Sequence, residues 1–338
     1  MKRWIVFLTK RLLALPVSLF IVVTFSFMLV AFMPGDPARV IAGGLASEER
    51  LNEIRRELGL DKPVLERYAD YIADVARGDL GESYLRGRPI TFYIGRYLPN
   101  TIELMIVFFV LSIPFGLLIG TVGAYYALLL PDKIARTTIT VFQSIPDWLF
   151  GLLMIYVFFY LLGWAPAPVG RLGFVETFPD RRTGFLLIDT LLSRDLELFQ
   201  SALAHLALPG LTGGVIYSAY FARTTRTALA EALHSPQIEF ARACGLPERT
   251  VLRYAFTVAR TPILTYGAIL MGYMFGGVAI VEIVFTWRGF GQWSLESLMN
   301  LDLPAIQGFI IVVGAASLLV YILLDLLIMA LDPRIDVK

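Results

Sequence analysis

Long apolar stretches dominate the chain and alternate with shorter polar segments. A helix needs about 20 apolar residues to cross the roughly 30 Å hydrocarbon core of a bilayer. Six stretches are long enough, and we expect them to be transmembrane helices: 12–33, 102–130, 138–162, 203–229, 262–286 and 305–331. The first is longer than the apolar core of a signal peptide, so we expect it to be retained. The pattern therefore predicts an all-α membrane protein with six transmembrane helices.

Basic residues in the short flanks predict which way these helices face, because such flanks stay in the cytoplasm. The amino terminus carries four basic residues and no acid, and the segment 222–261 carries six arginines and three glutamates. Both are expected inside, which with six spans places the carboxyl tail inside too. The predicted organisation is as follows: 1–33, cytoplasmic amino terminus and first span; 34–100, extracytoplasmic helical insertion; 101–331, five-helix core with a cytoplasmic segment at 231–261; and 332–338, cytoplasmic tail.

The outer segment 34–100 carries the signals of two amphipathic helices. Ser47 is a suitable cap for the first, which should stop at Gly59. Pro63 suits the first turn of the second, whose apolar residues recur at helical spacing: Leu65, Tyr68, Ile72 and Val75. We expect a small lid packed on the transmembrane helices, with a docking surface for a partner as the alternative.

Composition and charge exclude several classes of function. The net charge of +1 provides no uniform basic surface, so a nucleic acid partner is not expected. The single cysteine, Cys244, and the two histidines, His205 and His234, are too few for a disulfide or a multi-cysteine metal site. No Gly-Lys pair occurs, so the chain has no Walker phosphate loop, and any coupling to ATP must come from another subunit.

The cytoplasmic segment between the fourth and fifth spans predicts a helical hairpin. A short helix at 236–244 should end at Gly245, and a return helix at 248–259 should lead to Pro262. Ala241 and Gly245 are small and lie four residues apart, which would allow close docking in a groove, and Glu239 and Arg242 could pair beside them. The residues alone leave open whether this hairpin docks on a partner or is merely a cytoplasmic connection.

The sequence EFARACG at 239–245, with Pro262 seventeen residues beyond Gly245, resembles the EAA loop of ABC-importer permeases. Further short motifs follow one another in the order found in the first permease subunit of dipeptide, oligopeptide and nickel importers: MPGDPA, LGLDKPVLERY, RGDLGES, LPNTIEL, SIPDW, LGWAPA, HLALPG, VEIVFTWRGFG and LDPRI. The resemblance spans nearly the whole chain. Phe240 departs from the alanine that the motif's name predicts, and Cys244 departs from the charged residue often found there.

This resemblance implies the fold of a type I ABC importer permease, in the inner (plasma) membrane of a bacterium or archaeon. It implies a transport subunit that is not an enzyme and carries no cofactor, because partner ATPase subunits bind ATP and Mg. The implied partners are a second homologous permease, two ABC ATPases, an extracytoplasmic substrate-binding protein and membrane lipid. The helix that couples to the ATPase would use these residues: Glu239, Ala241, Arg242, Gly245 and Leu246.

The implied cargo is a di- or oligopeptide, with nickel, glutathione or an oligosaccharide as alternatives. A self-sufficient, ion-coupled secondary transporter is the main alternative of a different class; it would have no need of a docking helix at 236–262. An intramembrane protease is disfavoured, because facing spans lack a serine–histidine or paired-aspartate arrangement.

Acidic residues in or near the spans are costly and therefore candidates for the translocation path. Asp147, Glu282 and Asp325 are the candidates, while Glu103 fits a structural role near the start of a helix. A peptide amino group or a metal cation could pass such acids, whereas helix capping or pairing with arginine would be purely structural. Asp147 follows Pro146, where we expect a break inside the third span.

Overall fold

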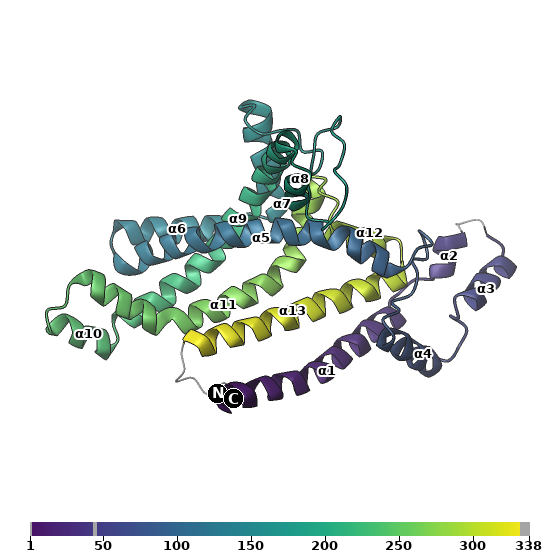
Figure 1. Cartoon of the computed structure of the whole chain (residues 1–338), viewed down its shortest axis with the longest axis horizontal. Coiled ribbons are helices and arrows are strands. Elements are labelled where there is room, and N and C mark those ends of the chain that lie inside the picture. The colour runs from purple at the N-terminus through teal and green to yellow at the C-terminus, as the bar shows by residue number, and fades with distance from the viewer. Residues whose placement is uncertain (1, 43–45, 332–338) are drawn as a thin grey trace. The chain divides into compact units, whose positions relative to one another are not determined.

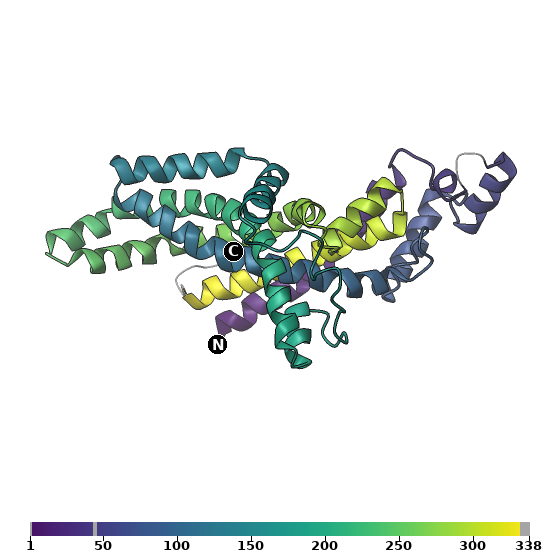
Figure 2. The same cartoon turned by 90° about the horizontal axis from the view of Figure 1, so that it is seen from above.

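The computed structural model describes residues 2–42 and 46–331, and the predicted tail at 332–338 lies outside them. Within these ranges the regular elements are helices, apart from one isolated bridge between Glu82 and Pro89. The elements, shown in Figures 1 and 2, are α1 (Lys2–Ala31), α2 (Pro37–Ala42), α3 (Glu48–Glu57), α4 (Val64–Ala76), α5 (Ile90–Tyr125), α6 (Leu130–Ser144), α7 (Asp147–Met154), the π-helical turns η1 (Ile155–Leu161), α8 (Leu186–Leu192), α9 (Leu196–Leu233), α10 (Pro236–Ala243), α11 (Glu248–Val284), α12 (Phe290–Met299) and α13 (Leu303–Leu331).

Five helices are long and apolar enough to cross a membrane: Leu13–Ala31, Ile90–Tyr125, Leu196–Leu233, Glu248–Val284 and Leu303–Ala330. A sixth span is present if the pair Leu130–Ser144 and Asp147–Leu161, bent by 101°, is one broken span. The all-helical membrane fold predicted from the sequence is confirmed.

The break in the third span lies where it was expected, at Pro146. Ile145 adopts an extended conformation (φ −82°, ψ 125°), as steric conflict with a following proline favours. Pro146 is also extended at ψ 138° and precedes the first residue of α7. The helix therefore stops at Ser144 and restarts at Asp147.

Three helices extend well beyond the stretches predicted from apolar composition. α5 begins at Ile90 instead of residue 102, and α9 begins at Leu196, where the Asp195 side chain accepts a hydrogen bond from the Leu198 amide at 2.9 Å. The return helix and the fifth span form one continuous helix, α11, with Pro262 inside it. A single proline removes only one backbone donor, which a long membrane helix tolerates.

The chain divides into two compact units. Among the described residues, the first comprises 2–42, 46–99 and 289–322, and the second comprises 100–288 and 323–331.

The helices α3 and α4 of the first unit begin and end close to the positions predicted from the sequence. The Ser47 hydroxyl accepts a hydrogen bond from the Arg50 amide at 3.3 Å, and α3 ends at a left-handed Gly59 with φ of +63°. Leu65 was expected on the packed face of the next helix, but 77% of it is exposed. The tyrosines of α4 contact α1 instead: Tyr68 bonds Thr24 at 2.8 Å and Tyr71 bonds Ser26 at 2.7 Å.

Helix α12 was not predicted, because its mixed sequence has no distinct apolar stripe. Its Phe290 and Trp293 are buried with Ile90 and Tyr93 in the core of the first unit, where Trp293 stacks on Tyr93 at 5.8 Å between ring centroids. The three residues that follow, Asn300, Leu301 and Asp302, connect α12 to α13.

In the second unit, small residues on α9 let α5 approach closely. A β-carbon at Gly213 would overlap the ring of Phe108, and one at Gly214 would lie 2.7 Å from Leu111 Cβ. Close approach of this kind is typical of membrane helices, whose association depends on van der Waals packing.

Asp302, 2% exposed, fastens the turn around Ser83 to the start of α13 within the first unit. Its carboxylate accepts hydrogen bonds from the Ser83 hydroxyl at 2.5 Å and from the Tyr84 amide at 3.0 Å. The turn itself is closed by a bond from the Ser83 amide to the Arg88 carbonyl.

We expect Asp302→Ala to lower the free energy of unfolding by about 2 kcal/mol, because two buried donors lose their acceptor. The measurement is the thermal unfolding midpoint of the protein in detergent. Asp74→Ala, on the exposed surface of α4, is the control and should change stability by less than about 0.5 kcal/mol. Equal melting curves for the two variants would contradict the assigned role of Asp302.

Candidate functional site

Helix α10 ends in a turn that only glycine adopts without strain. The Gly245 amide bonds the Arg242 carbonyl at 2.9 Å and the Leu246 amide bonds the Ala241 carbonyl at 3.3 Å, which is the Schellman pattern. Gly245 has φ of +74°, and a β-carbon there would meet open space. The predicted short helix, glycine turn and return helix are therefore present.

The exposed face of α10 differs from the one expected. Ala241 is 6% exposed and lies with Ile238 on the side of α10 that packs against the protein, while the side chains beside it face outward. Phe240 is 71% exposed, and Glu239 beside it is also exposed. Leu246 is 37% exposed just beyond the turn. The residue that departs from the family motif is thus the largest apolar group offered by this helix.

Arg242 bridges the two arms of the hairpin. Its Nε lies 3.3 Å from the Glu248 carboxylate at the start of α11, and its Nη1 donates to the Leu233 carbonyl at 3.4 Å. The expected pairing with Glu239 is therefore wrong, because Glu248 across the turn is the nearer acceptor. Glu239 has no ion pair within the described residues, which leaves its charge available at the surface.

The three acids proposed for the path lie in different surroundings. Asp147 is half-buried at the first turn of α7, and Asp325 is partly exposed in α13. Glu282 is completely buried and accepts a hydrogen bond from the Thr101 hydroxyl. Its carboxylate thus lies between α11 and α5, and a role for Glu282 in the path stays a prediction.

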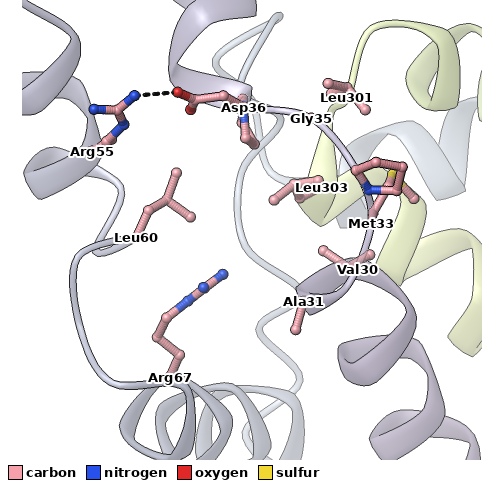
Figure 3. A pocket seen from close by; sticks show the side chains of 12 residues that line it. Val30, Ala31, Met33, Gly35, Asp36, Arg55, Leu60, Arg67, Leu301 and Leu303 are labelled. Carbon is pink, nitrogen blue, oxygen red and sulfur yellow. Dashed lines mark hydrogen bonds and ion pairs between the residues drawn. The ribbon is translucent and has the colours of Figure 1, made fainter. Parts of the chain in front are cut away.

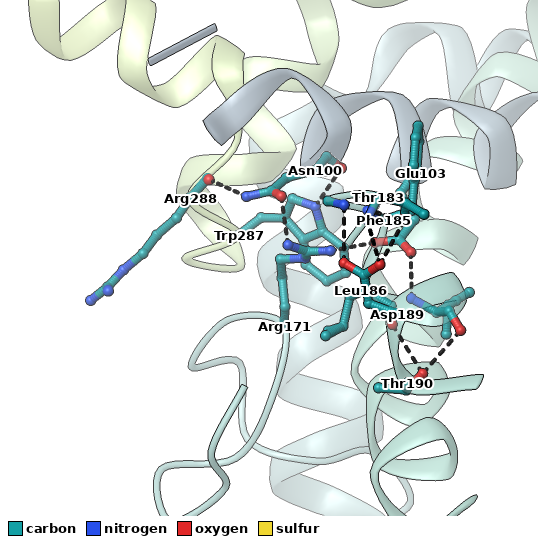
Figure 4. Close-up of polar contacts among 12 residues, drawn as sticks. Asn100, Glu103, Arg171, Thr183, Phe185, Leu186, Asp189, Thr190, Trp287 and Arg288 are labelled. Atoms are coloured by element: carbon teal, nitrogen blue, oxygen red, sulfur yellow. Dashed lines mark hydrogen bonds and ion pairs between the residues drawn. The ribbon is translucent and has the colours of Figure 1, made fainter. Parts of the chain in front are cut away.

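A buried polar network centres on Arg171, in the loop before α8 (Figure 4). The Arg171 guanidinium donates to Asn100 Oδ1 at 2.5 Å and to Glu103 Oε2 at 2.6 Å, and it lies 5.8 Å from the centroid of the Trp287 ring. Glu103 Oε1 accepts from the Leu187 amide at 2.8 Å. Burial lowers the pKa of Arg171, and the neighbouring Glu103 carboxylate opposes that shift.

The structural role expected for Glu103 is confirmed, but for a different reason. Since α5 begins at Ile90, Glu103 lies well inside the helix and does not interact with its amino-terminal dipole. Its partner is Arg171, far away in the sequence. Asn100 extends the network. Its side-chain amide donates to the Arg288 backbone carbonyl at 2.9 Å, and its backbone carbonyl accepts from the Trp287 indole at 3.0 Å.

Asp189 closes the loop that carries Arg171. Its carboxylate accepts hydrogen bonds from the Thr183 amide and hydroxyl, both at 2.7 Å, and from the Gly184 amide at 3.0 Å (Figure 4). Burial alone would raise the pKa of Asp189, but these hydrogen bonds to the ionised form outweigh burial and lower it. The loop is thus held at both ends by charged groups.

The first unit contains a cavity of about 230 Å³ beyond the end of α1 (Figure 3). Its wall includes Val30, Leu60 and Leu303, and the Arg67 side chain points into it. Asp36 pairs with Arg55 at 2.5 Å on the rim, and this hydrogen bond lowers the pKa of the Asp36 carboxyl. Sequence periodicity gave no sign of this cavity, because its lining comes from four separate segments.

The two histidines take local backbone contacts. His205 Nδ1 lies 2.8 Å from the Ser201 carbonyl and His234 Nδ1 lies 2.8 Å from the Ala230 carbonyl. In the part of the chain that the structure describes, no group of three or more histidine, cysteine or acidic side chains could hold a metal ion.

Comparison with known proteins identifies relatives along the whole chain. The family described as "Binding-protein-dependent transport system inner membrane component" matches residues 112–337, and the family described as "Binding-prot-dependent transport system membrane comp, N-term" matches residues 4–105.

Three individual relatives cover nearly the full length. The probable D,D-dipeptide transport system permease protein DdpB of Escherichia coli (strain K12) is 37% identical over 92% of this chain and 91% of its own. The di/tripeptide transport system permease protein DppB of Pseudomonas aeruginosa (strain UCBPP-PA14) is 35% identical over 97% and 98%. The glutathione transport system permease protein GsiC of Escherichia coli (strain K12) is 32% identical over 98% and 99%.

We expect Glu103→Gln to lower the free energy of unfolding by about 3 kcal/mol, because Arg171 is left as a buried charge without its counter-ion. Arg171→Met should have a cost of similar size. The double variant should lose clearly less than the two costs added together, because it removes both charges. Thermal unfolding of the four proteins in detergent measures this coupling, and additive losses would show that the pair does not interact.

Proposed function

Because this chain belongs to the family of binding-protein-dependent transport system inner membrane components, we propose that it forms half of the path through which an ABC importer carries di- or oligopeptides. The observation that carries the proposal is the full-length similarity to permeases described as acting on dipeptides and di/tripeptides.

The broader assignment follows directly from the family. The chain is a multi-pass membrane protein and an ABC importer permease of the peptide and glutathione branch. Members of the family are transport subunits and not enzymes, they carry no cofactor, and the ATPase lies in partner subunits. The resemblance read from the ordered sequence motifs is thereby confirmed, and a self-sufficient secondary transporter is ruled out.

The proposed cargo is a short peptide. Two of the relatives described above are permeases for short peptides, and the third is a permease for glutathione, which is itself a modified tripeptide. These descriptions favour a short peptide over nickel or an oligosaccharide. An extracytoplasmic binding protein would deliver the peptide, as the family's description implies.

The assembly and its orientation are proposed on the same basis. A second homologous permease would form the other half of the path, and two ATPase subunits would bind ATP and Mg on the cytoplasmic side. Both termini and α10 would then face the cytoplasm, in agreement with the basic residues of 222–261. The region 34–100 and the loop around Arg171 would face outward.

Helix α10 has the features required for coupling to an ATPase subunit. It is short, ends in a defined glycine turn, and leads without interruption into α11. Its exposed groups are the apolar Phe240 and Leu246 beside the charged Glu239, a combination suited to a cleft with an apolar floor and a polar rim. Closure of that cleft would displace α10 and α11 together.

We expect Phe240→Ala to weaken the contact with the ATPase by about 2 kcal/mol, as truncation of an anchoring aromatic residue does. The measurement is peptide uptake by the reconstituted complex, together with recovery of the ATPase subunits on a tagged permease. Phe174→Ala is the control, because Phe174 is 87% exposed in the outer loop. Normal uptake and normal recovery by Phe240→Ala would refute the docking role.

We expect Gly245→Trp to leave the protein in the membrane and to uncouple ATP hydrolysis from uptake, because the turn that positions α10 becomes strained. Gly87→Trp is the matched control: Gly87 also has a positive φ, of +57°, and open space beside it, but lies in the outer segment. Hydrolysis and uptake are measured in proteoliposomes with loaded binding protein. Coupled transport by Gly245→Trp at the rate of Gly87→Trp would contradict this assignment.

A further inference from the structure

A buried hydroxyl without a partner lies beside the bend in the third span. Tyr217 is 1% exposed, and its hydroxyl has no hydrogen-bond partner in the part of the chain that the structure describes. Buried polar groups are nearly always hydrogen-bonded, because an unsatisfied one loses its hydration without compensation. The fold itself therefore leaves this hydroxyl able to take one further polar partner.

The Asp147 carboxylate lies next to the same position. A β-carbon at Gly277 would overlap the Tyr217 hydroxyl and lie 3.2 Å from Asp147 Oδ2, so glycine leaves both groups close together. Asp147 has no ion pair with any described residue. The helix break at Pro146 holds it at the first turn of α7, within an apolar span, where an uncompensated carboxylate is costly.

Aromatic rings continue from this point toward the open face of α11. The ring of Tyr220 lies 6.5 Å from that of Tyr217 and 6.1 Å from that of Tyr273, between centroids. Tyr273 is 61% exposed, and β-carbons at Gly272 and Gly276 would meet open space. A ligand can therefore approach the α11 backbone along a wall of tyrosine rings.

These groups share one chemical preference. A carboxylate and a phenol oxygen accept hydrogen bonds, and the faces of tyrosine rings attract cations. A protonated amine supplies three donors and one positive charge, and it has no acceptor that would conflict with them. Glu282, by contrast, is enclosed and already bonded to Thr101, so it is not part of this arrangement.

We propose that Asp147, Tyr217, Tyr220 and Tyr273 form a binding site for the protonated amino terminus of a peptide passing through the permease. The site rests on the proposed function, since it names the group by which that cargo is held at the bend. It neutralises the peptide's amino-terminal charge within the membrane, where an unpaired charge is most costly.

The test uses the complete importer in proteoliposomes, with the dipeptide alanyl-alanine as probe, because its amino terminus is its only ammonium group. Asp147→Asn should reduce uptake at least about tenfold, while Asp147→Glu retains most of it. Tyr217→Phe should reduce uptake severalfold. Hydrolysis stimulated by loaded binding protein should persist in these variants, because α10 is unchanged.

Asp180→Asn and Tyr126→Phe are the matched controls, since both residues are exposed and lie outside the site. Uptake by Asp147→Asn and Tyr217→Phe equal to that of these controls would overturn the site but leave the proposed function intact. Failure of the wild-type complex to import any di- or oligopeptide would overturn both. If Asp147→Asn does not fold, Tyr217→Phe and the labelling below decide.

Photolabelling during turnover locates the amino terminus directly. One dipeptide carries a diazirine side chain on its first residue and a second carries it on its last residue, and both keep a free amine. The first should label the segments around Asp147, Tyr217 and Tyr273 several times more strongly than the second. Equal labelling by both peptides, or labelling only by the second, would overturn the orientation and with it the proposal.

Discussion

A backbone amide that leaves a helix inside hydrocarbon has no water to bond, and this constraint shapes the third span. At Ile145 and Pro146 the chain leaves the helix while keeping backbone hydrogen bonds. The Ile145 amide still donates to the Val141 carbonyl at 3.2 Å, and the Phe150 amide donates to the Pro146 carbonyl at 3.0 Å. Pro146 itself has no backbone N–H that would need an acceptor. The bend of 101° therefore keeps these two amides paired, and it places the acidic Asp147 at the first turn of α7.

The polar network around Arg171 solves the related problem of holding an irregular loop against long helices. A buried ion pair contributes little net stability, because desolvation offsets the Coulomb attraction, but it fixes geometry once both partners are present. Arg171 donates hydrogen bonds to Asn100 and Glu103 on α5. The backbone carbonyl of Asn100 also accepts a hydrogen bond from the Trp287 indole. The loop, α5 and the residues after α11 are thus held together by buried polar groups that satisfy one another's hydrogen bonds.

Sequence reasoning worked best where the signal is local. The cap at Ser47, the glycine ends at Gly59 and Gly245, and the break at Pro146 each depend on neighbouring residues, and the structure has all of them. The spans were found because apolar length is sufficient to identify them, although α5 and α11 extend beyond the apolar stretches.

The features that the sequence did not reveal share a physical cause, because each concerns which way a side chain faces. The burial of Ala241 is decided by the helices that α10 packs on, and the enclosure of Glu282 by Thr101, 181 residues away in the sequence. Arg242 pairs with Glu248 across the turn and not with Glu239 on its own helix.

One helix connects the features that matter most for transport. α11 runs for 37 residues, about 55 Å, from the turn after Gly245 to the residues just before Trp287. Gly277, against which Asp147 and Tyr217 lie, is on this same helix, and Glu282 near its carboxyl-terminal end accepts a hydrogen bond from Thr101 on α5. On the proposed coupling, a displacement of α10 reaches the bend and the network around Arg171 through one continuous helix. Pro262 lies between the turn and Gly277, yet the helix continues through it without a break, so the two ends of α11 remain parts of one element.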